Sequence, residues 1–171
     1  GLRCAAMEAH IRHAVPADLS RINAIYNSHI VEGHMSFDFE PWSSEQRNAW
    51  FERYAETGRY QVLVIAADAE VFGFAASGPY RDKEGYNTSV ETTIVLDKRY
   101  LGRGFGTSLL RRLIEQLAAE DVHRAYALIA LPNQRSVALH ERFGYREVGV
   151  LDEVGRKQGS YHSVLMMERS F

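Results

Sequence analysis

The 171-residue sequence has little of what marks several special classes of protein. It holds one cysteine, Cys4, so an internal disulfide is impossible and a reducing compartment, the cytoplasm, is expected. No apolar run approaches the roughly 20 residues of a membrane span. The net charge of −2 provides no attraction to nucleic acid or to an anionic membrane surface. We therefore expect a globular protein that binds neither nucleic acid nor membranes.

Metal-ligand patterns and a structured N-terminus are missing as well. His10, His13, His29 and His34 have no cysteine or acid at ligand spacing, so we expect no bound metal. Residues 1–10 show no hydrophobic periodicity, and Met7 would serve as a natural start. We expect an unstructured leader or an expression remnant over residues 1–10, and a single domain over 11–171.

The order of apolar patterns predicts an α/β fold. Strands are expected at 11–15, 61–67, 71–77, 90–96, 124–130, 145–151 and 161–167, and helices at 19–30, 43–55, 105–117 and 133–143. Helices and strands alternate at first, and strands dominate toward the end. This order favours a mixed, partly antiparallel sheet flanked by helices.

The most informative stretch is a strand, a glycine turn and a helix within residues 90–117. Gly102, Gly104 and Gly106 separate the β-branched strand from an apolar helix face. Glycines allow positive φ angles and close approach to a ligand, and the start of a helix offers free N–H groups to an anion. The stretch therefore predicts a phosphate site. A tight turn without a ligand is the alternative.

The spacing argues against two familiar phosphate motifs. A dinucleotide fingerprint requires glycine where Thr107 stands, and an acid at the end of the next strand, whereas Glu120 and Asp121 precede that strand. A Walker loop requires Gly-Lys-Ser/Thr, but Arg103 is the only basic residue inside the turn.

A second pattern lies about thirty residues further on. Asn133, Ser136 and His140 recur at i, i+3 and i+7, so they share one face of a helix that Gly144 ends. Taken alone, Asn133 could be a plain N-cap and His140 a surface histidine. Glu91, at the head of the apolar strand 90–96, is a partly buried acid with a raised pKa, an edge-facing acid in solvent, or part of a structural ion pair.

Together the two patterns resemble the GNAT N-acetyltransferases. Leu101 to Gly106 is similar to the family's Arg/Gln-x-x-Gly-x-Gly/Ala, with Leu101 departing, and residues 133–145 are similar to its second motif. The resemblance runs from residue 11 to about 168. It looks closest to the phosphinothricin and methionine sulfoximine N-acetyltransferases, through the Val-Glu head of strand 90–96 and the late Gly155-x-Lys157-x-Gly159 pattern.

The resemblance implies a GNAT fold, acetyl-CoA as co-substrate and roles for named residues. It makes Glu91 the base that deprotonates the amine and His140 the acid that faces the sulfur. The main chain of Ile94, Val95 and Leu96 would hold the pantetheine arm, and Asn133 and Ser136 the amide arm. The pyrophosphate would lie over Gly102, Arg103, Gly104, Phe105, Gly106 and Thr107.

The acceptor is expected to be the α-amine of a small L-amino acid analogue such as phosphinothricin or methionine sulfoximine. The loop carrying Arg81, Glu84, Gly85 and Tyr86 would hold its polar groups, with Arg81 on the carboxylate, and Phe37 would form an apolar wall. Another amine (a polyamine, an aminoglycoside or a protein N-terminus) and a non-catalytic CoA-binding module are the alternatives. Relatives of this kind imply a homodimer.

Overall fold

The computed structural model describes residues 8–171, so Cys4 and most of the expected leader lie outside the described residues. The helices are α1 (Leu19–Glu32), α2 (Ser44–Phe51), α3 (Phe105–Ala118) and α4 (Gln134–Arg142). The strands are β1 (His10–His13), β2 (Val62–Ala67), β3 (Glu70–Pro79), β4 (Ser89–Leu96), β5 (Arg124–Ala130), β6 (Arg146–Lys157) and β7 (Ser160–Ser170). None of the helices in this part of the chain is both long and apolar enough to cross a membrane.

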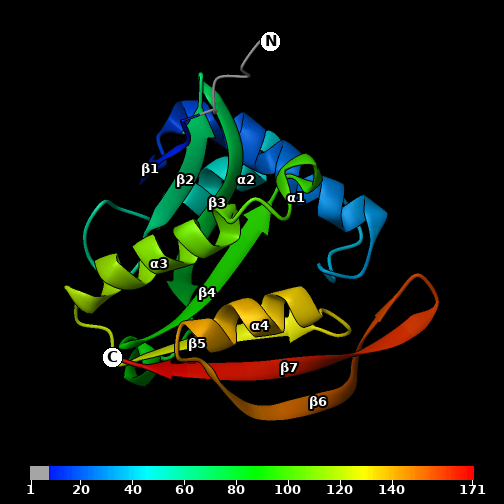
Figure 1. Ribbon diagram of the computed structural model, residues 1–171. Coiled ribbons are helices and arrows are strands. Elements are labelled where there is room, and N and C mark those ends of the chain that lie inside the picture. The colour runs from blue at the N-terminus through cyan, green and yellow to red at the C-terminus, as the bar shows by residue number, and fades with distance from the viewer. Residues whose placement is uncertain (1–7) are drawn as a thin grey trace, which may run out of the picture.

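The strands form one seven-stranded sheet in the order β1-β2-β3-β4-β5-β7-β6. All neighbours are antiparallel except β4 and β5, which run parallel and are joined through α3. Figure 1 shows α3 and α4 in front of the sheet, with α1 and α2 behind it. The expected α/β fold with a mixed sheet flanked by helices is confirmed.

Strand β2 explains why both faces of the sheet are covered. Its side chains alternate between two cores, with Leu63 and Ile65 facing α3, and Val62 and Val64 facing α1. Every residue of the strand is buried, so it is apolar throughout rather than alternating. The leucine-rich face of α3 fills the first core, and Leu19, Ile22 and Ile25 of α1 fill the second.

Most expected elements are present, with some different ends. Strand β1 begins at His10, one residue inside the expected leader. Helix α2 ends at Phe51 rather than at 55, because the Ala55 N–H donates to the Tyr60 carbonyl at 3.0 Å instead of continuing the helix. The last two strands are longer than expected and pair as a hairpin, with β6 at the edge of the sheet.

Candidate active site

The parallel strands β4 and β5 separate after a short region of pairing, and this separation creates the site. Their pairing ends where Glu91 is opposite Tyr126, whereas β4 stays paired with β3 as far as Leu96. The edge of β4 that faces β5 beyond Glu91 therefore has no strand partner among the described residues. Its main-chain groups are available to a ligand that binds like a strand.

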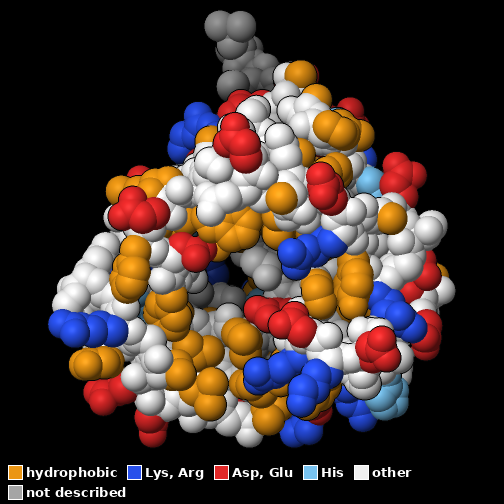
Figure 2. All heavy atoms as spheres, turned by 180° about the vertical axis from the view of Figure 1, so that it is seen from behind, with side chains coloured by type: hydrophobic (Ala, Val, Ile, Leu, Met, Phe, Trp, Pro, Cys, Tyr) orange, Lys and Arg blue, Asp and Glu red, His pale blue; other side chains and the backbone are white. Residues whose placement is uncertain are grey.

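A cavity of about 450 Å³ occupies the opening between the two strands. It is lined by β4 from Glu91 to Val95, by β5 from Ala127 to Ala130, and by residues of α1, α4 and the loop after α1. Figure 2 shows the protein surface hollowed near the middle of the face opposite to that of Figure 1. Ile94 and Val95 line this larger cavity, as expected, but Leu96 does not.

A smaller cavity of about 210 Å³ lies on the other side of Glu91. Its walls come from α1, α2, β3 and the chain that joins α1 to α2, and they are rich in aromatic rings. Tyr26, Glu91 and Thr93 line both cavities. The Glu91 carboxylate is thus placed where a group in one cavity would meet a group in the other.

Burial alters the acidity of Glu91. Desolvation raises the pKa of its carboxyl group above the ordinary value, and the nearby charge of Arg81 opposes that rise. A carboxylate with a raised pKa is a stronger base than an exposed one, and it stands closer to what proton abstraction near neutral pH requires. No ion pair of Glu91 is found within residues 8–171, which argues against the structural alternative.

Helix α4 brings its polar stripe to the larger cavity. Asn133, Ser136 and His140 all line it, so the shared face expected from their spacing is present. Asn133 is also the N-cap, because its Oδ1 accepts from the Ser136 N–H at 3.2 Å. The cap and a ligand contact are compatible, since the Asn133 amide nitrogen points elsewhere, at 3.6 Å from the Met35 sulfur.

His140 is buried rather than on the surface. Its Nδ1 lies 2.7 Å from the Ser136 carbonyl oxygen, which can only accept, so Nδ1 carries the proton. Burial lowers the pKa of the ring, which favours the neutral form, and Nε2 is buried without a hydrogen-bond partner in the described chain. In that form Nε2 can accept but not donate. His140 can therefore protonate a thiolate only after it takes up a proton itself.

The glycine turn has the backbone geometry expected of a phosphate loop. Gly102 and Gly104 have φ of 75° and 81°, and Gly104 is the N-cap of α3. The first N–H groups of α3, from Phe105 to Thr107, have no acceptor within the helix. The Phe105 ring stacks on Phe72 in the core at 5.4 Å, so only its main chain can serve a ligand.

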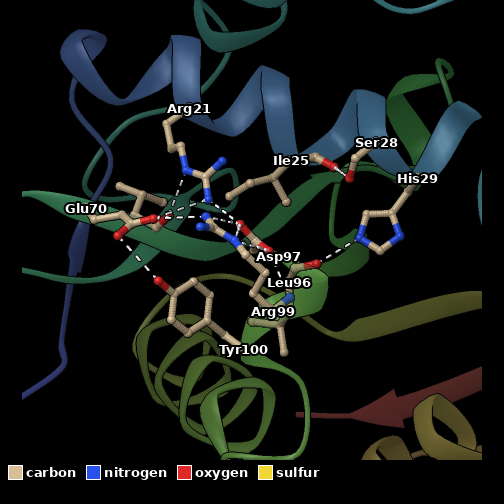
Figure 3. Close-up of polar contacts among 10 residues, drawn as sticks. Arg21, Ile25, Ser28, His29, Glu70, Leu96, Asp97, Arg99 and Tyr100 are labelled. Carbon is tan, nitrogen blue, oxygen red and sulfur yellow. Dashed lines mark hydrogen bonds and ion pairs between the residues drawn. The ribbon is translucent and has the colours of Figure 1, made fainter. Parts of the chain in front are cut away.

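An ion-pair cluster fixes the chain between β4 and this turn (Figure 3). Asp97 accepts from the Arg99 N–H at 2.9 Å and pairs with the guanidinium groups of Arg21 and Arg99. These contacts lower the pKa of Asp97. His29 donates through Nε2 to the Leu96 carbonyl at 2.7 Å, so that carbonyl is already occupied. The expected role of Leu96 in holding pantetheine is thereby limited to its N–H group.

Buried Lys157 of β6 holds the loop after α1 against the larger cavity. Its Nζ donates to the carbonyls of Ile30 at 2.7 Å and Ser36 at 2.6 Å. The Phe37 ring lies so close to Gly155 that a Cβ at that glycine would be 2.3 Å from it. Phe37, expected as a wall of the acceptor site, lines the larger cavity and not the smaller one, and the β6–β7 hairpin holds it in place.

The loop expected to hold the acceptor lies elsewhere. Arg81, Glu84, Gly85 and Tyr86 are exposed, and none of them lines either cavity within this chain. Arg81 stacks on Tyr80, with its Cζ 5.2 Å from the ring centroid, and affects Glu91 through its charge. From the sequence, the tip of this loop was expected at the reacting centre. In the structure the loop lies outside both cavities.

Sequence reasoning missed the side chains of the smaller cavity. Arg47, Trp50 and Tyr54 recur at i, i+3 and i+7, beginning in α2, and together they line its wall. An arginine followed by two aromatic residues at helical spacing was the available signal. Tyr26 and Trp42, the remaining rings near Arg47, are distant in sequence and carried no such signal.

Comparison with known proteins agrees with this geometry. The Acetyltransferase (GNAT) family pattern matches residues 25–145, more than half of the chain. A phosphinothricin N-acetyltransferase of Streptomyces coelicolor is 46% identical over 165 residues, which is 95% of this chain and 96% of that protein. An L-methionine sulfoximine/L-methionine sulfone acetyltransferase of Pseudomonas paraeruginosa is 37% identical, covering 95% of this chain and 94% of the relative.

A solved structure extends the similarity to the fold. The phosphinothricin acetyltransferase of Sinorhizobium meliloti in complex with AcCoA superposes with a TM-score of 0.91 at 28% identity, covering 96% of this chain and 89% of that one. The family pattern includes the diverging strand β4, the glycine turn and the polar stripe of α4. The chain therefore belongs to the GNAT family of acetyltransferases.

Proposed function

We propose that this protein transfers the acetyl group of acetyl-CoA to the α-amine of a small L-amino acid analogue of the phosphinothricin or methionine sulfoximine type. The main support is that two cavities of different character meet at one partly buried carboxylate, Glu91. Relatives named for these acceptors, at 46% and 37% identity over nearly the whole chain, support the choice of acceptor.

The donor occupies the larger cavity in this proposal. The pantetheine arm pairs with the free edge of β4 at Ile94, since the main chain of Val95 faces Phe74 of β3. The side chains of Asn133 and Ser136 line the opposite side. The pyrophosphate lies at the glycine turn, where main-chain N–H groups and the α3 dipole favour an anion. The AcCoA complex of a structural relative supports this donor.

The reaction proceeds where the cavities meet. Glu91 takes a proton from the acceptor ammonium, directly or through water, and the free amine attacks the thioester carbonyl. A main-chain N–H of β4 stabilises the developing oxyanion, a contribution of about 3–4 kcal/mol in known cases. Collapse of the tetrahedral intermediate breaks the C–S bond, and the nitrogen loses its second proton to water or to the thiolate as the amide forms. His140 faces the departing thiolate and protonates it when its own imidazole is charged.

Measuring the free thiol released at fixed acetyl-CoA tests the proposal. Methionine sulfoximine, phosphinothricin, spermidine and a peptide amine are compared as acceptors. We expect the highest kcat/KM for the two amino acid analogues. A higher value for spermidine or the peptide would give the protein a different acceptor. Saturable acetyl-CoA binding without thiol release for any amine would make it a CoA-binding module.

We further propose that the protein is a cytoplasmic homodimer. Edge strand β6 carries the exposed apolar side chains of Val148, Val150, Leu151 and Val154, and Tyr161 of β7 is 60% exposed. A sheet edge that is unpaired within the described part of the chain and carries such side chains favours association, and a second copy is the occupant that the resemblance implies. Sedimentation equilibrium should give twice the chain mass, and Leu151→Glu should shift it to that of the monomer.

A further inference from the structure

The smaller cavity contains a buried cation. Arg47 of α2 is 2% exposed, and its guanidinium lies 4.2 Å from the Trp42 ring and 4.6 Å from those of Tyr26 and Trp50. Its Nε donates to Asn23 Oδ1 at 3.1 Å, which fixes the plane of the group. The aromatic rings and Asn23 thus hold the guanidinium at the wall of the cavity.

Part of this guanidinium has no partner in the protein. Arg47 Nη2 is buried without a hydrogen bond, and Arg47 forms no ion pair with any residue in the range 8–171. The acid whose charge acts on it, Asp38, already accepts from Tyr26 Oη at 2.6 Å and Trp42 Nε1 at 3.2 Å. Buried charges in proteins are nearly always paired, so this nitrogen lacks an anion.

We propose that Arg47 binds the α-carboxylate of the acceptor in the smaller cavity, while Glu91 receives the proton of its α-amine. The inference rests on the proposed function and assigns the residue that recognises the acceptor. One carbon separates the amine from the carboxylate in an α-amino acid, so the base and the cation must line the same cavity. Arg47 and Glu91 do so.

The size and walls of the cavity fit the same acceptor. A volume of about 210 Å³ lies below the roughly 300–1,000 Å³ of typical ligand pockets, which restricts the ligand to a small molecule. Trp50, Tyr54 and Phe74 provide apolar contacts for the carbon chain of the side chain. A polyamine would place a second cation beside Arg47, which disfavours it. Arg81 is exposed and does not line the cavity, so it acts on Glu91 only through its charge.

Two acceptors that differ only at the carboxylate test the assignment. Methionine sulfone has a neutral side chain, so its acid and its methyl ester isolate the α-carboxylate from any side-chain charge. The ratio of kcat/KM for the acid to that for the ester is measured in wild type, Arg47→Lys and Arg81→Ala. Because both acceptors meet the same enzyme preparation, losses of folded protein or of acetyl-CoA affinity cancel in the ratio.

We expect the ratio to fall about 10- to 100-fold in Arg47→Lys, because the lysine ammonium cannot form the bidentate hydrogen bonds that a planar guanidinium makes to a carboxylate. The ratio should stay near its wild-type value in Arg81→Ala. Arg111→Lys makes the same chemical change on the exposed surface of α3 and should leave the ratio unchanged. A collapse of the ratio in Arg81→Ala would overturn the inference in favour of the exposed loop.

An unchanged ratio in Arg47→Lys, with both acceptors slowed equally, would overturn the inference and make Arg47 a structural cation. If Arg47→Lys does not fold, as judged by its melting temperature, the Arg81→Ala ratio still decides between the two arginines. A wild-type enzyme that acetylates neither acceptor would refute the proposed function itself, and this inference with it.

Discussion

The two sides of Glu91 are built from different parts of the polypeptide. On the donor side, the proposed contacts come largely from main chain: the free edge of β4, the glycine turn and the first N–H groups of α3. On the acceptor side, they come from side chains: a buried arginine enclosed by aromatic rings contributed by α1, α2 and the chain between them.

The difference matches what each ligand demands. Acetyl-CoA is the same molecule in every turnover, and main-chain groups bind it without needing particular side chains. The acceptor differs between enzymes of this kind, as the names of the relatives show. A pocket made of side chains can change its ligand by substitution while the donor side is left intact. Substitutions on the donor side should therefore change acetyl-CoA binding, and substitutions on the acceptor side should change the choice of acceptor.

The largest expected effect is at the glycine turn. Gly104→Val should abolish measurable acetyl-CoA binding by calorimetry, because a β-branched residue disfavours the φ of 81° that directs the helix N–H groups at the phosphates. The fold should persist, since no atom of residues 8–171 lies within 4 Å of the added Cβ.

Gly58→Val is the matched control for that substitution. Gly58 has a similar φ of 88° and equally open space, but it lies in the loop between α2 and β2. The Gly58→Val variant should have its melting temperature lowered by about as much as that of Gly104→Val, and should keep wild-type affinity for acetyl-CoA. Wild-type affinity for acetyl-CoA in Gly104→Val would mean that the pyrophosphate binds elsewhere. It would contradict the claim that main-chain groups of the glycine turn bind the donor.

A smaller effect is expected at His140. His140→Gln should lower kcat by less than about tenfold, which is below the roughly 10²- to 10⁴-fold that a proton donor typically contributes. The reason is that the resting imidazole is neutral and its Nδ1 proton is bound to Ser136. The pH dependence of kcat is the informative readout. A loss of 10²-fold or more, with the basic limb of the profile removed, would instead show that His140 is the obligatory acid.

The smallest effect on catalysis should come from Asp97, which acts on the turn from a distance. Asp97→Asn removes charged hydrogen bonds to Arg21 and Arg99, and should lower the free energy of unfolding by about 1–3 kcal/mol. It should weaken acetyl-CoA binding only a few-fold.

The pH dependence of stability tests whether the charge of Asp97 causes this loss of stability. The folded-state pKa of Asp97 is lowered, so its contribution is complete above the unfolded pKa of about 3.9 and is lost as the pH falls below it. The stability difference between wild type and Asp97→Asn should therefore shrink in acid. A difference that stays constant from pH 7 down to pH 3 would assign the effect to packing.

The features of the proposed donor side can be found in the sequence because they are local. The glycine turn, Gly102 to Thr107, is recognised by three glycines between a strand and a helix. The polar stripe, Asn133 to His140, is recognised by three polar residues at helical spacing. Neither pattern requires knowledge of the tertiary structure. The separation of β4 from β5 was not predictable, since neither strand's sequence marks where their pairing ends. The cavity that opens there is also lined by residues of α4 and of the loop after α1, which are distant in sequence from β4.

The residues of the smaller cavity, the proposed acceptor site, were missed because they meet only in the fold. Arg47 owes its burial to Tyr26 and Trp42, which lie in α1 and in the chain between α1 and α2. The loop with Arg81 was favoured instead because it adjoins Glu91 in sequence. Proximity along the chain was a poor guide here, since the loop remains at the surface.

The pH–rate profile of Glu91→Gln tests most directly the claim that one buried carboxylate joins the two sides. Glutamine keeps the size of the side chain but cannot take a proton, so kcat/KM near neutral pH should fall about 10²- to 10⁴-fold. The loss should shrink as the pH rises toward the pKa of the acceptor amine, where free amine no longer needs a base. A mutant profile parallel to that of wild type, at any level of activity, would contradict the account and assign proton abstraction to another group.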